Sequence, residues 1–149
     1  MEKTITKNPF CSAMAGIKTL HYIDVDNVTS QRPSGEGWSV TLASGHEWKQ
    51  IHFSQVQAAT EREGGCYRHS VEATVPGKGS VSARDLLTLE QGRYLVRATD
   101  NNGVQWLIGD TESPLRLTVA DTNGGTPQEE TAYRLTFSGI SLWPQMRII

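Results

Sequence analysis

The segment Asp100-Asn101-Asn102-Gly103 has the residue types of a ligand site, because oxygen-bearing side chains followed by glycine are typical of calcium loops. An EF-hand loop needs oxygen ligands at positions 1, 3 and 5, glycine at position 6 and an acid at position 12. With Gly103 at position 6, position 1 is Ala98 and position 12 is Gly109, and neither side chain offers an oxygen. The segment therefore predicts a hairpin turn and no calcium site.

Two other segments contain only part of a known site. Cys66 and His69 are zinc-ligand types, but a structural zinc site needs four ligands, usually in two close pairs, and His46 and His52 are loosely spaced. The run Pro76-Gly77-Lys78-Gly79-Ser80 resembles half of a phosphate loop, but glycine follows its lysine where serine or threonine is required. We predict no metal site and no cofactor.

Nothing in the sequence indicates a reaction. Nucleophilic catalysis needs a serine or cysteine beside a base and an oxyanion pocket, and the chain has no Gly-x-Ser-x-Gly elbow. No two carboxylates stand apart as an acid–base pair. We therefore predict that the protein is not an enzyme. A small hydrolase stays as an alternative, and it requires a deep pocket near His46, Glu47 or His69.

Composition restricts the class of protein. A chain of 149 residues is expected to form one domain. Its 14 basic and 16 acidic residues are spread evenly, so we predict no specific nucleic-acid binding. No segment approaches the roughly 20 apolar residues that span a bilayer, and the N-terminus lacks the apolar region of a signal peptide. We expect no membrane contact, a cytosolic chain, and reduced thiols at Cys11 and Cys66, with a disulfide between them as the alternative.

Short alternating apolar segments separated by turn signals dominate the chain and predict a mainly β fold. We expect an antiparallel β-sandwich or barrel with one short flanking α-helix at about residues 82–91, capped by Ser82 and ended by a left-handed Gly92. The predicted organisation is an N-terminal arm (1–15), a single β domain (16–139) and an apolar C-terminal tail (140–149). Strands are predicted at 17–25, 38–42, 47–53, 66–75, 93–99, 104–108, 114–120 and 131–139. Alternation predicts a mostly apolar face (Ile17, Thr19, His21, Ile23, Val25) and a mixed face (Lys18, Leu20, Tyr22, Asp24) for the first strand. It predicts an inward set of Tyr67, His69, Val71, Ala73 and Val75 for 66–75, and one face with Tyr133, Leu135 and Phe137 for 131–139.

The connections between these segments carry more specific predictions. Residues 30–37 are expected to be a loop, and 38–42 is expected to pair with 47–53 through the turn at residues 43–46. A type I′ turn at Asn102-Gly103 would place Ala98 opposite Leu107. Residues 55–62 fit either a helical turn or a strand.

The tail and the tryptophans are the candidate contact residues. The tail 140–149 is rich in apolar residues, which cost roughly 25 cal/mol per Å² in water, so it should dock on its own domain or on a neighbour. Trp143, before Pro144, is the best interface candidate among the four tryptophans. Tryptophans exposed on a β-sandwich would instead indicate a carbohydrate- or peptide-binding module, which we keep as the alternative function.

Several segments occur in an order that resembles small prophage-encoded virion structural proteins of gut anaerobes. They are GIKTLHYIDVD from Gly16, GRYLVRATDNNG from Gly92 with WLIG ending at Gly109, PLRL from Pro114, and YRLTFSG ending at Gly139. The layout of a sandwich, one helix and long arms is also similar to phage tail-tube proteins.

This resemblance implies a non-enzymatic virion protein, a tail component that assembles with copies of itself and with other virion proteins. It implies residence in the host cytoplasm during assembly and then in the virion. The residues expected to contact neighbours are Pro9, Phe10, Asn123, Gly124, Gly125, Leu142, Trp143, Met146 and Ile148.

Overall fold

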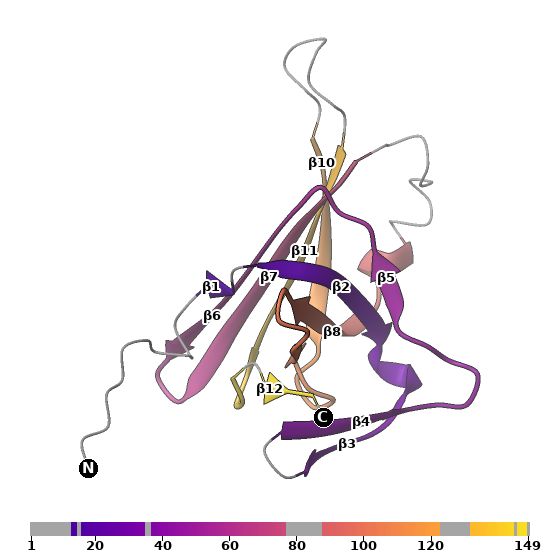
Figure 1. Cartoon of the computed structure of the whole chain (residues 1–149), viewed down its shortest axis with the longest axis vertical. Coiled ribbons are helices and arrows are strands. Elements are labelled where there is room, and N and C mark those ends of the chain that lie inside the picture. Colours follow the sequence, from indigo (N-terminus) through magenta and orange to yellow (C-terminus); the bar gives the residue numbers. More distant parts are fainter. Residues whose placement is uncertain are drawn as a thin grey trace.

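The computed structural model describes residues 13–14, 16–34, 37–76, 88–122, 132–144 and 146–148. These residues are mainly antiparallel β-structure, as predicted, with a short 3-10 turn, η1 (Val25–Asn27), and a helical turn at residues 88–90 (Figure 1). The strands are β1 (Ala13–Met14), β2 (Ile17–Asp24), β3 (Val28–Ser34), β4 (Gly37–Leu42), β5 (Lys49–Ile51), β6 (Gln55–Glu63), β7 (Cys66–Pro76), β8 (Arg93–Asp100), β9 (Gln105–Ile108), β10 (Leu115–Thr122), β11 (Ala132–Ser141) and β12 (Met146–Arg147).

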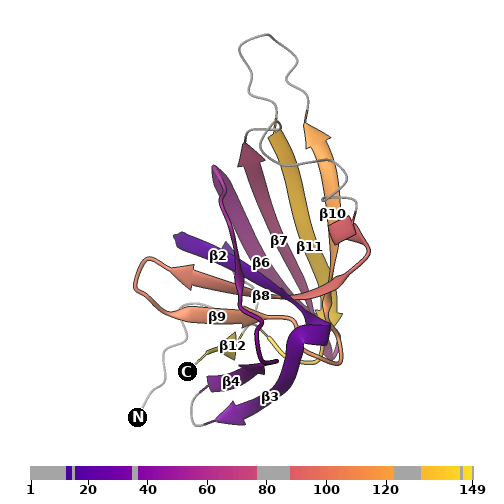
Figure 2. The same ribbon diagram turned by 90° about the vertical axis from the view of Figure 1, so that its right-hand side faces the viewer.

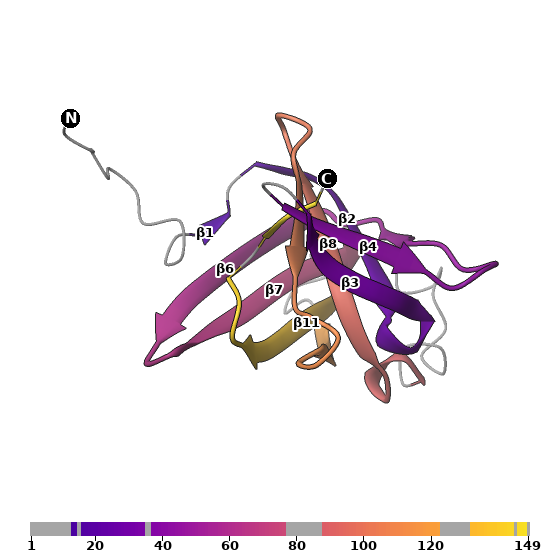
Figure 3. The same cartoon turned by 90° about the horizontal axis from the view of Figure 1, so that it is seen from below.

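One large sheet has the strand order β1-β6-β7-β11-β10-β8-β2-β5, with β9 added to β8 and β12 added to β9. β1 lies beside β6 at one end of this order (Figure 3), and β5 is at the other. Within the described residues these two ends are not paired with each other, so the sheet is sandwich-like and does not close into a barrel. β3 and β4 form a separate hairpin.

The main core lies where the large sheet folds over itself. Figure 2 shows β6, β7, β11 and β10 in one layer, with β2, β8 and β9 crossing at an angle to it. Alternation along β7 and β11 turns Val71, Ala73, Leu135 and Phe137 inward, and all four are buried. Both strands and their inward-facing sides were predicted correctly.

A second cluster covers the other side of β2 and β8. Leu20 of β2 joins the main core, whereas Ile23, three residues later, packs with Leu95 and Trp38 in the second cluster. The β3–β4 hairpin supplies Trp38 and lies on the far side of β2 and β8 from β7 (Figure 2). Because both faces of β2 and β8 are covered, these strands bury residues of both parities, and Leu20, on the face of residues 17–25 predicted to be mixed, is fully buried.

The predicted pairing of residues 38–42 with 47–53 is wrong. β4 pairs with β3, and β5 pairs with β2, so the turn at Gly45 connects strands that belong to different sheets. The predicted loop at 30–37 is also mostly strand, with Pro33 in β3, a strand that pairs on one side only, where proline is tolerated. Residues 55–62 are in the strand β6.

The turn between β8 and β9 is a hairpin turn, as predicted, but its type and register differ. The Asp100 carboxylate accepts hydrogen bonds from the backbone N–H groups of Asn102 (2.8 Å) and Val104 (3.0 Å). Only Gly103 has positive φ (+83°), which indicates a type I turn followed by a bulge. Ala98 therefore lies opposite Trp106 instead of Leu107.

The helix predicted at residues 82–91 falls largely outside the described residues, which include only its last turn. Leu89 packs against the main core, and its carbonyl accepts a 2.6 Å hydrogen bond from the Tyr94 hydroxyl. Gly92 does not have the predicted left-handed conformation. Glycine is needed there because a Cβ atom would lie 2.5 Å from the Tyr94 hydroxyl.

Candidate functional site

The segment that follows the inward-facing part of β11 carries the large apolar side chains that the described surface leaves exposed. Ile140, Leu142 and Trp143 are 53%, 66% and 50% exposed. We call these three residues the C-terminal surface. Between them, Ser141 points inward and is buried, so the segment is attached to the core while its apolar side chains face solvent.

A buried histidine holds this segment in place. His69 of β7 is fully buried, and its Nε2 atom lies 3.0 Å from the Trp143 carbonyl oxygen and 2.8 Å from Ser141 Oγ. Ser141 Oγ also donates to the Trp143 carbonyl at 2.8 Å. On the other side of the ring, Nδ1 lies 3.0 Å from Thr60 Oγ1 in β6. Three strands and the C-terminal segment are therefore joined through one imidazole.

The geometry of His69 gives it a structural role instead of that of a catalytic base. A carbonyl oxygen can only accept, so the contact with Trp143 requires a proton on Nε2. The nitrogen that faces Ser141 then cannot remove the serine proton. Burial lowers the pKa of His69, while its bond to the Trp143 carbonyl and the charge of Asp110 partly oppose this shift. The neutral ring with Nε2–H is the form that matches its surroundings.

Trp143 also contacts the second cluster. Its ring meets the ring of Trp38 edge to face, with centroids 5.4 Å apart. The two tryptophans line a pocket of about 240 Å³ together with Gln31, Asp110 and neighbouring backbone. Trp38 is buried, and its indole Nε1–H has no hydrogen-bond partner among the described residues. The pocket thus combines an aromatic wall with the polar side chains of Gln31 and Asp110.

The end of the tail packs on its own domain. Met146 of β12 lies opposite Leu107 of β9, and Ile148 forms a bridge with Trp38. Both side chains pack against the second cluster. These contacts add to the direct packing of Trp38 against Ile23, Leu95 and Leu107, which already joins the β3–β4 hairpin to the large sheet.

The sequence-predicted contact residues therefore divide into three groups. Leu142 and Trp143 are exposed and remain available to a neighbour. Met146 and Ile148 pack in cis, which was one of the two outcomes expected for the tail. The others, Pro9, Phe10, Asn123, Gly124 and Gly125, lie outside the described residues.

Sequence reasoning did not find the Thr60–His69–Ser141 group. The inward direction of His69 was predicted from the alternation of β7, but its partners are separated from it by 9 and 72 positions. They come together only because β7 pairs with both β6 and β11. In this register His69 lies opposite Thr60 of β6 on one side and Gly139 of β11 on the other.

The pocket expected for a hydrolase is only partly present. His46 and Glu47 do line a pocket of about 480 Å³ with Tyr22, Asp24 and Tyr94, but His69 is not among its lining residues. The shifted groups there are phenols: burial raises the pKa of Tyr22, and burial together with the Asp24 charge raises that of Tyr94 to about 12. Phenols this weakly acidic are poor proton donors at neutral pH.

Other kinds of site find little support in the part of the chain that the structure describes. No three His, Cys, Asp or Glu side chains gather there as metal ligands. Cys66 is a half-buried free thiol, and Cys11 lies outside the described residues. None of the described helices is long and apolar enough to cross a membrane.

Comparisons of the chain with protein-family models, with curated proteins and with solved structures find no match.

Proposed function

We propose that this protein is a non-enzymatic structural subunit of a phage or prophage virion, a tail component that acts by assembling with copies of itself and with other virion proteins. The observation that carries the assembly part is the C-terminal surface. Three large apolar side chains face solvent on a segment that His69 and Ser141 hold in a fixed position. Contiguous exposed apolar side chains on an ordered segment are typical of protein–protein contacts.

The phage context comes from the sequence resemblance, and two features are consistent with it. The described fold is a β-sandwich-like domain, the architecture that the resemblance implies. The segment that continues from β11 also presents exposed Leu142 and Trp143 before Met146 and Ile148 pack back on the domain. The subunit would be made in the host cytoplasm and would function in the virion.

Replacing Leu142 with glutamate is expected to weaken self-association by about tenfold or more, because a charge would be buried in an apolar contact. Leu142 is 66% exposed, so the fold of the monomer should be retained. Sedimentation velocity of the wild type and of Leu142→Glu would measure this. The control is Ser44→Glu, which adds the same charge on the exposed turn before β5. Equal association of all three proteins would contradict the role of the C-terminal surface.

A carbohydrate- or peptide-binding module is the second candidate, and the pocket between Trp38 and Trp143 favours it. The half-exposed Trp143 indole beside Gln31 and Asp110 suits stacking on a sugar ring with polar side chains at its rim. On this hypothesis, a panel of oligosaccharides would change the tryptophan fluorescence of the wild type, and Trp143→Ala would abolish that change. Association weakened by Leu142→Glu without any saccharide response would favour assembly.

A further inference from the structure

The layer formed by β6, β7, β11 and β10 has an outer face that is polar and charged. The strand registers place Ala59, Ser70, Ser138 and Arg116 in one continuous row across the four strands. This row ends on Arg93 of β8, which lies directly opposite Arg116. The adjacent residues Leu115 and Tyr94 are buried, so both arginines point to the outer face.

Two arginines directly opposite each other are an unfavourable cross-strand pair, because like charges in this position repel. Within the described residues neither arginine forms an ion pair; Arg93 donates only to the carbonyl of Gly92. The nearby Glu90 carboxylate accepts from the Val119 N–H. The pair therefore does not serve to stabilise the described fold.

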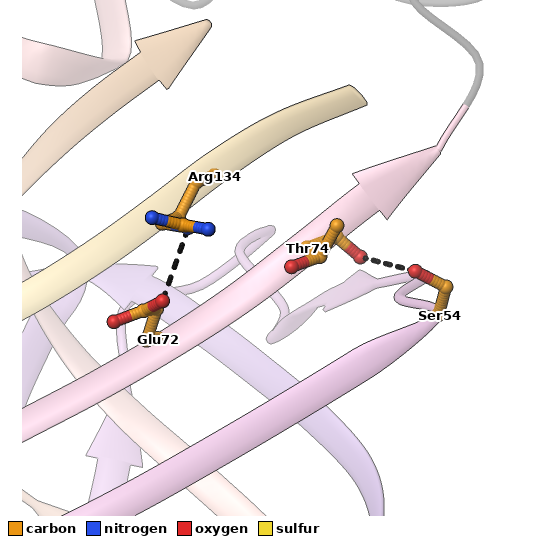
Figure 4. Close-up of polar contacts among 4 residues, drawn as sticks. All are labelled: Ser54, Glu72, Thr74 and Arg134. Carbon is orange, nitrogen blue, oxygen red and sulfur yellow. Dashed lines mark hydrogen bonds and ion pairs between the residues drawn. The ribbon is translucent and has the colours of Figure 1, made fainter. Parts of the chain in front are cut away.

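The middle of the same face is balanced in charge. Arg134 forms an ion pair with Glu72 at 3.1 Å, and Figure 4 shows this pair extending from β11 to β7. Beside this pair, the Ser54 hydroxyl donates a 3.3 Å hydrogen bond to the Thr74 carbonyl (Figure 4). Uncompensated charge is thus confined to the two sides of the layer.

The opposite side of the face, on β6, is acidic. Glu61 is exposed and forms no ion pair in the described part of the chain, and the largely exposed Glu63 pairs with Arg68 at 2.8 Å, so two carboxylates stand beside one guanidinium. Arg62 lies between them, but strand alternation turns it to the other face. Glu61, Arg68 and Ile140 lie opposite one another and form a second row on this face. This row is two residues along each strand from the row that contains Arg116.

We infer that the two sides of this face are complementary to each other: the Arg93–Arg116 pair of one copy contacts Glu61 and Glu63 of a second copy placed side by side with it. This inference rests on the proposed assembly function and names its partner surface. The contact is heterologous, because different surfaces of the two copies meet, and it can therefore repeat along a ring or filament. Ile140, opposite Arg68 and diagonal to Arg116, adds apolar area beside the charges.

A charge-swap experiment on the full chain tests this contact. Arg93→Glu/Arg116→Glu makes both sides acidic, and Glu61→Lys/Glu63→Lys makes both sides basic. Each variant alone is expected to self-associate at least about tenfold more weakly than the wild type, because like charges at a contact are strongly unfavourable. An equimolar mixture of the two variants should recover association, because each acidic copy can then contact a basic copy on both of its sides. The control, Arg32→Glu on exposed β3, should behave like the wild type.

Sedimentation velocity in low and high salt gives the readout, with circular dichroism to confirm folding and Arg116→Glu alone as a milder variant. Wild-type association without any effect of the swaps would overturn this contact and leave the proposed function standing. A wild type that never associates would overturn both. If Arg93→Glu/Arg116→Glu instead abolished binding of a single-stranded DNA oligonucleotide and left self-association unchanged, the pair would serve nucleic acid and the inference would be wrong.

Discussion

Replacing His69 with alanine should lower the free energy of unfolding by about 3–5 kcal/mol, measured by urea denaturation followed by tryptophan fluorescence. The ring is fully buried, so its removal leaves a cavity. It also withdraws the Nε2–H donor from the Trp143 carbonyl and a hydrogen-bond partner from Thr60. Buried polar groups that lose a partner cost about 1–3 kcal/mol each.

The same substitution should loosen the C-terminal segment. Hydrogen exchange of the amides after Ser141 is expected to become faster in His69→Ala, because the Trp143 carbonyl loses one of its two donors. His46→Ala, on an exposed turn, is the matched control and should change the free energy of unfolding by no more than about 0.5 kcal/mol. A change below about 1 kcal/mol in His69→Ala would show that the imidazole does not hold the segment.

The His69 environment also sets a pH dependence. Burial lowers the pKa of His69 in the folded state, so the unfolded chain takes up a proton first as the pH falls below 6.5. The stability of the folded state is therefore full above about pH 6.5 and declines as the pH falls towards the folded pKa. His21 contributes in the same direction, because burial, Arg97 and His52 lower its pKa. The decline should be smaller in His69→Ala.

The second large effect is expected at Trp38. Trp38→Ala should lower the free energy of unfolding by about 3–5 kcal/mol, because the indole fills the second cluster and contacts both Trp143 and Ile148. These contacts join the β3–β4 hairpin to the C-terminal segment, so both should lose protection in hydrogen exchange. Urea denaturation followed by circular dichroism measures the loss without depending on the removed fluorophore.

Trp38→Phe separates packing from hydrogen bonding. The indole Nε1–H has no partner within the described part of the chain, so phenylalanine loses no hydrogen bond there and should cost clearly less than alanine. If Trp38→Ala left stability unchanged, the hairpin and the tail would not pack as described. If Trp38→Phe lowered the free energy of unfolding as much as Trp38→Ala, the Nε1–H group would make a stabilising interaction beyond the contacts described above.

Alternation was the most reliable guide to the fold. β7 and β11 pack on one side only, and their inward residues Val71 and Phe137 were predicted from a period of two. β2 and β8 are covered on both faces, so the same rule did not show that Leu20, on the mixed face of residues 17–25, is as buried as Ile23 on the apolar face. The β3–β4 hairpin was missed because residues 30–37 are rich in turn-forming types, including Pro33, yet pair with β4.

The candidate site was only partly accessible from the sequence. Leu142 and Trp143 were predicted as contact residues from the apolar composition of the tail, and both are exposed. The His69 group and the Arg93–Arg116 pair depend on the register between distant strands, which the sequence does not specify locally. The turn at Asp100 was predicted with the wrong register for a related reason. The Asp100 carboxylate accepts from two backbone N–H groups, and β8 and β9 pair one residue away from the predicted register.

Sedimentation velocity of the wild-type chain over a range of concentrations tests the central claim most directly. The assembly function predicts species heavier than one chain, whose proportion rises with concentration and falls when Leu142 is replaced by glutamate. A protein that sediments as a single chain at every concentration, with Leu142→Glu indistinguishable from it, would contradict the claim.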